Sequence, residues 1–165
     1  MKKRQEHLYD APIDQVWAMY RDPASHVAKF ESMGHRNLEL LEEDVSDDAV
    51  RVVIARDVTV DLPGFAKKVL KPTNRVTSID EWSANGDGTY GGTFTTETKG
   101  APVHIAGTTH LEAEGEDRTR FTVEVEVRID VPLIGGKLSR WAEGDVEETF
   151  RQEFAAGDRW LAEHA

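Results

Sequence analysis

Arg56 and Asp80 are the two residues of this chain best placed to do chemistry. Arg56 continues the alternating apolar run of Val52 and Ile54. Asp80 lies two residues before Trp82 on a second alternating run. Because alternate residues of a strand share one face, both charged side chains are predicted to point inward among apolar neighbours. There they could bind a polar group of a ligand, and desolvation would suit them to general acid–base catalysis.

A structural interpretation of the same two residues remains open. Arg56 and Asp80 could form a satisfied ion pair with no further role. Alternatively, the strand over residues 74–82 has the opposite phase and both groups lie in water, because a slip of one residue turns every side chain to the other face.

The six histidines raise the question of a metal site, and His104 and His110 are the most suggestive pair. Their even spacing places them on one face of a strand, but six residues at ~3.3 Å separate them by ~20 Å, which is too far for one zinc ion. Both alternate with apolar residues and are predicted to face water. The sequence therefore predicts no metal site, and nothing in it calls for a cofactor.

Other catalytic and binding motifs have simpler explanations. Residues 86–91 match the glycine spacing of a dinucleotide-binding loop, but a β-branched strand pattern follows where a helix would be required, so we predict a hairpin turn. The chain has no cysteine and no Gly-x-Ser-x-Gly motif, which leaves nucleophilic catalysis without support. The acidic residues of the last helix are expected in solvent. They are Glu143, Asp145, Glu147, Glu148 and Glu153.

The elements that must position Arg56 and Asp80 can be read from the alternation and the turn signals. Pro12 opens a first short helix, and Asp22-Pro23 caps and redirects a second one that ends at Gly34. An amphipathic pattern from Leu138 to Leu161 predicts a helix of ~40 Å. Short polar connections favour antiparallel hairpins between the strands. The expected strands are 5–9, 36–42, 49–59, 74–82, 89–97, 103–113 and 118–130.

Composition limits the function classes. A length of 165 residues suits a single domain, residues 1–165, and 39% hydrophobic with 31% charged residues is typical of a globular protein. No apolar run of ~18 residues exists, so an integral membrane protein is not expected. The basic start lacks the apolar segment of a signal peptide, and the absence of cysteine fits a cytoplasmic location. The net charge of −11 disfavours nucleic acid as a partner.

Several segments resemble a known superfamily. The run Ala11-Pro12-Ile13-Asp14-Gln15-Val16-Trp17-Ala18-Met19, followed by Arg21-Asp22-Pro23, is similar to the opening of the START-like (SRPBCC) superfamily, which includes birch-pollen-allergen-like proteins, polyketide cyclases and lipid-transfer domains. Residues 61–68 and 131–138, with Glu81-Trp82, resemble a bacterial, mainly actinobacterial, family of unknown function within it. The resemblance implies an α+β helix-grip fold: a curved antiparallel sheet of about seven strands around a long C-terminal helix, with two short helices after the first strand. It also implies room for a hydrophobic cavity, and it transfers no catalytic residue.

These observations predict a protein that binds a small hydrophobic or amphipathic molecule between the sheet and the last helix. Small inward residues, namely Gly92, Ala106, Gly107 and Gly157, are expected to leave space there. The basic segment 65–71 is either a lid over the cavity mouth or an ordinary connecting helix. The predicted ligand-binding residues are Val52, Ile54, Arg56, Asp80, Trp82, Phe94, Ile105, Val125, Val146 and Phe150.

Two other functions remain as alternatives. One is a cofactor-free enzyme with cyclase-like or dehydratase-like acid–base chemistry on a polyketide-type substrate, carried by Arg56 and Asp80. The other is a structural or protein-interaction module without an open cavity, which an exposed apolar patch would favour.

Overall fold

The computed structural model of the protein describes residues 2–165, and its elements follow the predicted order. In chain order they are β1 (Lys2–Tyr9), α1 (Ile13–Arg21), α2 (Pro23–Ser32), β2 (Arg36–Val45), β3 (Ala49–Thr59), the 3-10 helix η1 (Gly64–Lys68), β4 (Thr73–Ala84), β5 (Tyr90–Thr98), β6 (Val103–Glu114), β7 (Arg118–Ile129) and α3 (Gly135–Glu163). Strands β1, β2, β4 and β6 are longer than predicted. The first strand begins three residues earlier than the sequence predicts, because its side chains alternate between exposed and half-buried and only Tyr9 is fully buried, so the sequence of Lys2 to Arg4 carries no apolar alternation.

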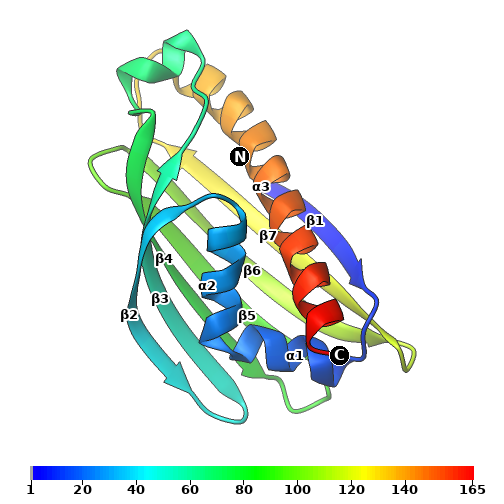
Figure 1. Cartoon of the computed structure of the whole chain (residues 1–165). Coiled ribbons are helices and arrows are strands. Elements are labelled where there is room, and N and C mark those ends of the chain that lie inside the picture. The colour runs from blue at the N-terminus through cyan, green and yellow to red at the C-terminus, as the bar shows by residue number, and fades with distance from the viewer. Residues whose placement is uncertain (1) are drawn as a thin grey trace.

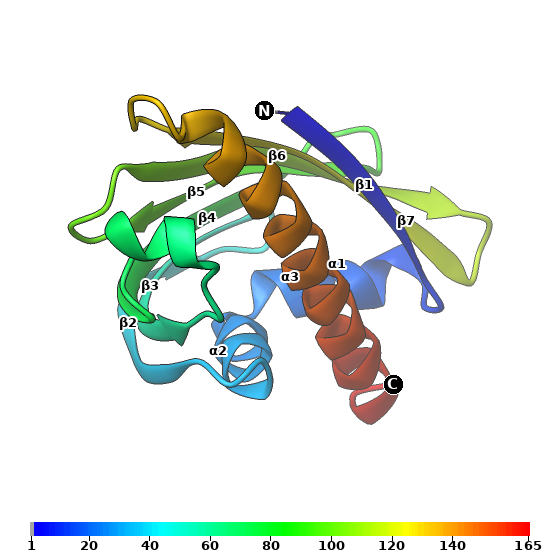
Figure 2. The same ribbon diagram turned by 90° about the horizontal axis from the view of Figure 1, so that it is seen from above.

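The strands form one seven-stranded sheet in the order β1-β7-β6-β5-β4-β3-β2. Every neighbouring pair is antiparallel, as the short polar connections predict. The sheet curves around α3, which crosses its concave side (Figures 1 and 2). The predicted helix-grip fold of the α+β class is therefore confirmed.

The turn between α1 and α2 follows the predicted capping chemistry. The Oδ1 atom of Asp22 accepts a hydrogen bond from the backbone N–H of Ala24 at 3.0 Å, and Pro23 is the first residue of α2. This cap restarts the helix in a new direction. Gly34, with φ at +84°, then ends α2 in a conformation that favours glycine. The two short helices lie beside the C-terminal half of α3 (Figure 2).

The core lies between the inner face of the sheet and the helices. On β7 the alternate residues Phe121, Val123, Val125 and Val127 are buried, as their spacing predicts. Val125 and Val127 pack against Val146 of α3 and its neighbours, whereas Phe121 and Val123 belong to a larger cluster with α1 and α2. Burial of this alternating face holds the long helix across the sheet.

The predicted role of the small residues is wrong. A Cβ atom added to Gly107 would lie 2.6 Å from the Phe94 ring, and one added to Gly157 would lie 2.9 Å from the ring of Tyr9. These glycines accommodate aromatic rings, so they leave no empty space. Ala106 has the opposite strand phase and is exposed on the outer face of β6.

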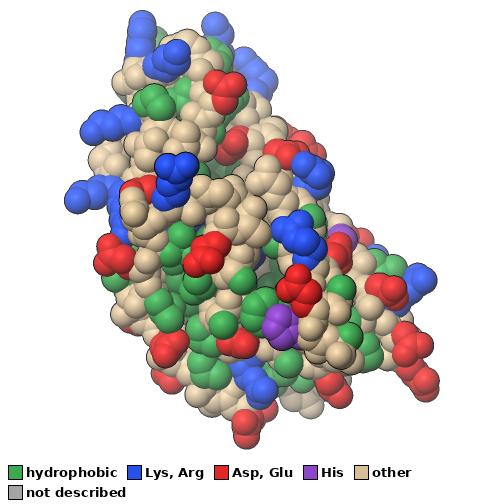
Figure 3. Space-filling model, viewed as in Figure 1, with side chains coloured by type: hydrophobic (Ala, Val, Ile, Leu, Met, Phe, Trp, Pro, Cys, Tyr) green, Lys and Arg blue, Asp and Glu red, His purple; other side chains and the backbone are tan. Residues whose placement is uncertain are grey.

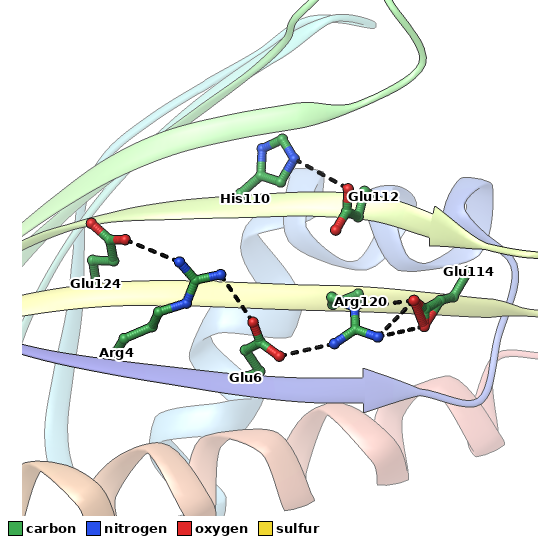
Figure 4. A network of polar contacts seen from close by, with 7 residues as sticks. All are labelled: Arg4, Glu6, His110, Glu112, Glu114, Arg120 and Glu124. Carbon is green, nitrogen blue, oxygen red and sulfur yellow. Dashed lines mark hydrogen bonds and ion pairs between the residues drawn. The ribbon is translucent and has the colours of Figure 1, made fainter.

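The outer face of the sheet carries charged side chains. Across β1, β7 and β6, Arg120 forms ion pairs with Glu6 at 2.9 Å and with Glu114 at 2.6 Å, and Arg4 joins Glu6 at 3.0 Å (Figure 4). His110 lies on this same face, near Glu112 (Figure 4). Among residues 2–165 no group of three or more His, Cys, Asp or Glu side chains is arranged to hold a metal ion.

The basic segment 65–71 overlaps the 3-10 helix η1 and connects β3 to β4, which corresponds to the second of its two interpretations, an ordinary connecting helix. Ala66 of η1 is fully buried in a small cluster with Leu62 and Leu138, while Lys67 and Lys68 are exposed. This cluster lies at the N-terminal end of α3, far along the helix from α1 and α2 (Figure 1). Within the part of the chain that the structure describes, no helix is both long enough and apolar enough to cross a membrane.

Candidate functional site

A cavity of about 140 Å³ lies beneath α3, between the inner face of the sheet and α2. Strands β3 to β7 provide its floor, and α3 provides its roof. The wall residues include aromatic rings, aliphatic side chains and several charged groups. They are Tyr20, His26, Lys29, Phe30, Arg56, Ser78, Asp80, Trp82, Phe94, Thr96, Ile105, Thr109, Phe121, Asp145, Val146, Thr149, Phe150, Glu153 and Phe154.

Seven of the ten predicted ligand-binding residues line this cavity. They are Arg56, Asp80, Trp82, Phe94, Ile105, Val146 and Phe150. The other three, Val52, Ile54 and Val125, are buried in the core but do not reach the cavity. Val52 and Ile54 face inward as predicted, yet the helices α1 and α2 cover that end of β3. Val125 is covered by the N-terminal half of α3.

Arg56 is a buried cation, with 6% of its surface exposed. Its Nε donates a hydrogen bond to Nδ1 of His35 at 3.0 Å, and one Nη donates to Oγ of Ser78 at 2.8 Å. The guanidinium carbon lies 3.6 Å from the centre of the Phe30 ring. Burial lowers the pKa of Arg56 to about 10, so the side chain remains charged at neutral pH. Its partners are neutral, and the guanidinium keeps further donors.

Asp80 lies on β4 in the same wall, two residues beyond Ser78. Burial raises the pKa of Asp80, and the nearby Lys29 and Arg56 charges only partly oppose that effect. No ion pair within 4.0 Å joins Arg56 to Asp80, so the satisfied pair considered for these two residues does not form. Among residues 2–165 no side-chain hydrogen bond or ion pair is formed by the Asp80 carboxylate. This carboxylate is therefore a desolvated acceptor at the cavity wall.

Two acidic residues of α3 line the cavity, Asp145 and Glu153. Asp145 is exposed, as the sequence predicts, whereas the prediction for Glu153 is wrong. Glu153 of α3 pairs with Lys29 of α2 at 3.1 Å, with both side chains mostly buried. Asp145 remains exposed, although partial desolvation of its carboxylate and the charge of Glu148 raise its pKa. The packing of α2 alongside α3 removes most of the Glu153 side chain from water. No local pattern in the sequence signals a contact between helices so far apart in the chain.

His26 is a wall residue that sequence reasoning missed. It lies in the first half of α2 with 2% of its surface exposed, and its Nε2 is 2.8 Å from the carbonyl oxygen of Tyr20. Burial and the neighbouring Lys29 charge lower the pKa of His26 to about 4, so the imidazole is neutral at pH 7. The sequence could have indicated this position in one way only: His26 lies four residues before Phe30, so both side chains share the apolar face of α2.

A second hollow of about 180 Å³ lies on the other side of the contact between α2 and α3. Tyr20, His26, Lys29 and Glu153 belong to the walls of both hollows. The surface is visibly hollowed between the two helices (Figure 3). The inner cavity and the outer hollow are thus separated by only a few side chains.

Comparisons with known structures agree with the fold. The chain is similar to the protein TTHA0849 from Thermus thermophilus, with 14% identity and a TM-score of 0.68 over 100% of this chain and 99% of that chain. It is similar to the Zhui aromatase/cyclase from Streptomyces sp. R1128, with 18% identity and a TM-score of 0.65 over 98% and 94% of the two chains. A START superfamily protein from Mycobacterium smegmatis matches with 10% identity and a TM-score of 0.58 over 99% of each chain.

At identities this low, the likeness establishes the fold alone, and it confirms the START-like resemblance of the sequence. A search of curated proteins gives no significant match. The family model described as "Protein of unknown function (DUF2505)" matches residues 4–161, which is nearly the whole chain. The protein is therefore a member of the DUF2505 family with a START-like helix-grip fold.

Proposed function

We propose that this protein binds one small amphipathic molecule in the cavity beneath α3. The observation that carries the proposal is a cavity with aromatic and aliphatic walls in which Arg56 and Asp80 retain unused hydrogen-bonding capacity. Ligand sites typically combine apolar walls with a few convergent polar groups. A cytoplasmic location, expected from the cysteine-free sequence, is part of this proposal.

The volume of the cavity limits the size of the ligand. A cavity of roughly 150 Å³ in another protein holds benzene, and the cavity here is about 140 Å³. A single ring with one or two polar substituents therefore fits, whereas a long acyl chain does not fit without movement of α2 or α3. The proposed ligand class is consequently the small amphipathic one, in preference to lipids.

Titration with phenol, a small amphipathic molecule, followed by two-dimensional NMR, tests this proposal. We expect saturable shifts of one molecule per chain, confined to residues around the cavity. The variant Ile105→Phe fills the cavity and should abolish the shifts. Its matched control is Ile129→Phe, because Ile129 packs elsewhere under α3 and does not line the cavity. Shifts that do not saturate, or that persist in Ile105→Phe, would contradict ligand binding at this site.

Asp80 favours a second candidate, the cofactor-free acid–base enzyme. A desolvated carboxylate without a partner is suited to remove a proton, and Arg56 is suited to donate a hydrogen bond to a carbonyl oxygen nearby. The chain is similar in fold to an aromatase/cyclase, and this similarity supports the enzyme candidate only in that the same fold can carry such an activity. In this proposal the proton moves from the carbon beside the carbonyl to the Asp80 carboxylate, which later returns it.

Exchange of the methyl protons of acetophenone in D₂O provides a test of the enzyme candidate. NMR should show faster exchange with the wild-type protein than with Asp80→Asn, while acetophenone binds both proteins. Equal exchange in the two proteins would exclude Asp80 as the base and leave ligand binding alone.

The interaction module has weaker support. The large exposed apolar residues of β2 are Leu40, Leu41 and Val45. The intervening residues 42–44 are acidic, so the strand presents no continuous apolar surface.

A further inference from the structure

The side chain of His26 has one polar atom that no group in the protein satisfies. Its Nε2 faces the carbonyl oxygen of Tyr20, and a carbonyl only accepts hydrogen bonds. Nε2 therefore carries the ring proton, which leaves Nδ1 as an acceptor. Among the described residues, this buried Nδ1 has no hydrogen-bond partner. Because a buried polar atom is rarely left unpaired, His26 points to a missing donor.

A second unpaired atom lies on another element of the same cavity. The Oγ1 atom of Thr109, on β6, is buried without a partner within residues 2–165. Thr109 and His26 both line the cavity, although one comes from the sheet and the other from α2. With Asp80 on β4, three elements each contribute to the cavity wall a residue whose side chain has a polar atom without a hydrogen-bond partner among the described residues.

We infer that His26, Thr109 and Asp80 form the acceptor side of the ligand site, and that the ligand is a ring-sized molecule bearing a hydroxyl or N–H donor. This inference rests on the proposed function and adds the chemistry that the ligand must have. Arg56, whose guanidinium keeps donors that no protein group uses, donates and so binds the ligand's own oxygen. A purely apolar ligand would leave His26 and Thr109 unsatisfied, and a ligand with only acceptors would leave the Nδ1 atom of His26 without a donor.

Binding of phenol, anisole and toluene to the wild-type protein tests the inference, because the three probes share a ring and differ in their hydrogen-bonding groups. Phenol donates and accepts, anisole only accepts, and toluene does neither. We expect phenol to bind about tenfold more tightly than anisole and toluene, the effect of one well-made hydrogen bond. Equal affinities for phenol and toluene would overturn the inference and leave the proposed function intact. Failure of all three probes to bind would overturn both.

Two variants remove the acceptors separately. His26→Gln keeps a donor for the Tyr20 carbonyl and removes the ring acceptor, and Thr109→Val removes the hydroxyl with little change of shape. Each is expected to reduce the preference for phenol over toluene severalfold. The matched controls are His104→Gln and Thr108→Val, since both residues lie outside the cavity wall. Preference unchanged in both cavity variants would contradict the inference.

The protonation of the His26 ring, measured first in the free protein and then with each probe, completes the test. The ¹⁵N NMR resonances of the His26 ring should report a proton on Nε2 and none on Nδ1 in the free protein. Addition of phenol should shift the Nδ1 resonance, and addition of toluene should not. A proton on Nδ1 in the free protein, or equal shifts with both probes, would show that His26 is not the acceptor. Thermal unfolding of each variant verifies that it is folded.

Discussion

The ring of Phe94 on β5 lies directly over Gly107 on β6. A Cβ atom at position 107 would be 2.6 Å from two carbons of that ring and 2.3 Å from the backbone oxygen of Glu124. Real Cβ atoms do not approach other atoms so closely, so only glycine fits beneath Phe94. Phe94 also lines the cavity, so its contact with Gly107 determines where this ring lies in the cavity wall.

Substitution of Gly107 by alanine should therefore destabilise the protein. The added methyl group must displace the Phe94 ring and separate β6 from β7, and overpacking of this kind costs about 1–3 kcal/mol or more. Chemical denaturation measures the loss. Gly144→Ala is the control, because a Cβ atom there meets nothing within 4 Å and alanine favours a helix. We expect that control to gain about 0.5–1 kcal/mol, and a loss of stability in Gly144→Ala as large as that of Gly107→Ala would contradict the explanation.

Replacement of Arg56 by lysine should cost about 1–3 kcal/mol of stability, although the charge is kept. Lysine cannot donate to His35 and Ser78 together while stacking on Phe30, so buried partners lose their donors. The control is Arg51→Lys, because Arg51 forms its ion pairs with Glu42 and Glu81 on the exposed side of the sheet. The free energy of unfolding of that control should change by less than about 0.5 kcal/mol. Equal losses in the two variants would refute the buried role of Arg56.

Asp80→Asn should stabilise the fold at pH 7. A pKa raised by burial means that the folded protein holds the Asp80 proton more tightly than the unfolded chain does. The protonated Asp80 therefore contributes to stability at a pH below its pKa in the unfolded chain, and this contribution is lost as the pH rises through its pKa in the folded protein. At pH 7 the ionised Asp80 is unfavourable for folding. We expect a gain of about 1 kcal/mol at pH 7 from removing the charge, and little gain at pH 3.

Asp57→Asn is the control for Asp80→Asn, because the pKa of Asp57 is lowered in the folded protein whereas that of Asp80 is raised. Asp57 accepts hydrogen bonds from Asn37 at 2.8 Å and from Arg75 at 3.1 Å, and both lower its pKa. Its variant should lose stability at pH 7. Urea unfolding curves at the two pH values compare the two variants, and a loss for Asp80→Asn at pH 7 would show that its carboxylate has a partner in the folded protein.

His26 should make the stability of the protein depend on pH in the acid range. Its pKa falls to about 4 in the folded state, against 6.5 for an ordinary histidine, because of burial and the Lys29 charge; Glu153 and Asp22 act in the opposite direction. The neutral form is thus favoured in the folded state. Its contribution is complete above pH 6.5 and is lost as the pH falls toward 4, by up to about 3 kcal/mol.

Comparison of the wild-type protein with His26→Gln isolates this effect from the many carboxylates. The difference in unfolding free energy between the two proteins should be constant above pH 7 and should shift in favour of the variant between pH 6.5 and pH 4. A difference that stays the same over the whole range would mean that His26 titrates normally.

Much of the fold could be predicted from the sequence because its signals are local. The alternation from Phe121 to Ile129 determines which face of β7 is buried, and the Asp22-Pro23 cap determines where α2 begins. The inward phase of Arg56 and Asp80 follows from the same two-residue period. Each of these features depends on residues within a few positions of one another.

The composition of the cavity wall was decided only by tertiary packing. Nothing near Glu153 indicates that α2 will cover its side chain, and nothing near Val52 or Ile54 indicates that α1 and α2 will fill the space above them. Likewise, glycines predicted to leave room instead receive the rings of Phe94 and Tyr9. A strand or helix period tells which face is buried, but which atoms meet there depends on contacts between segments that are distant in the chain.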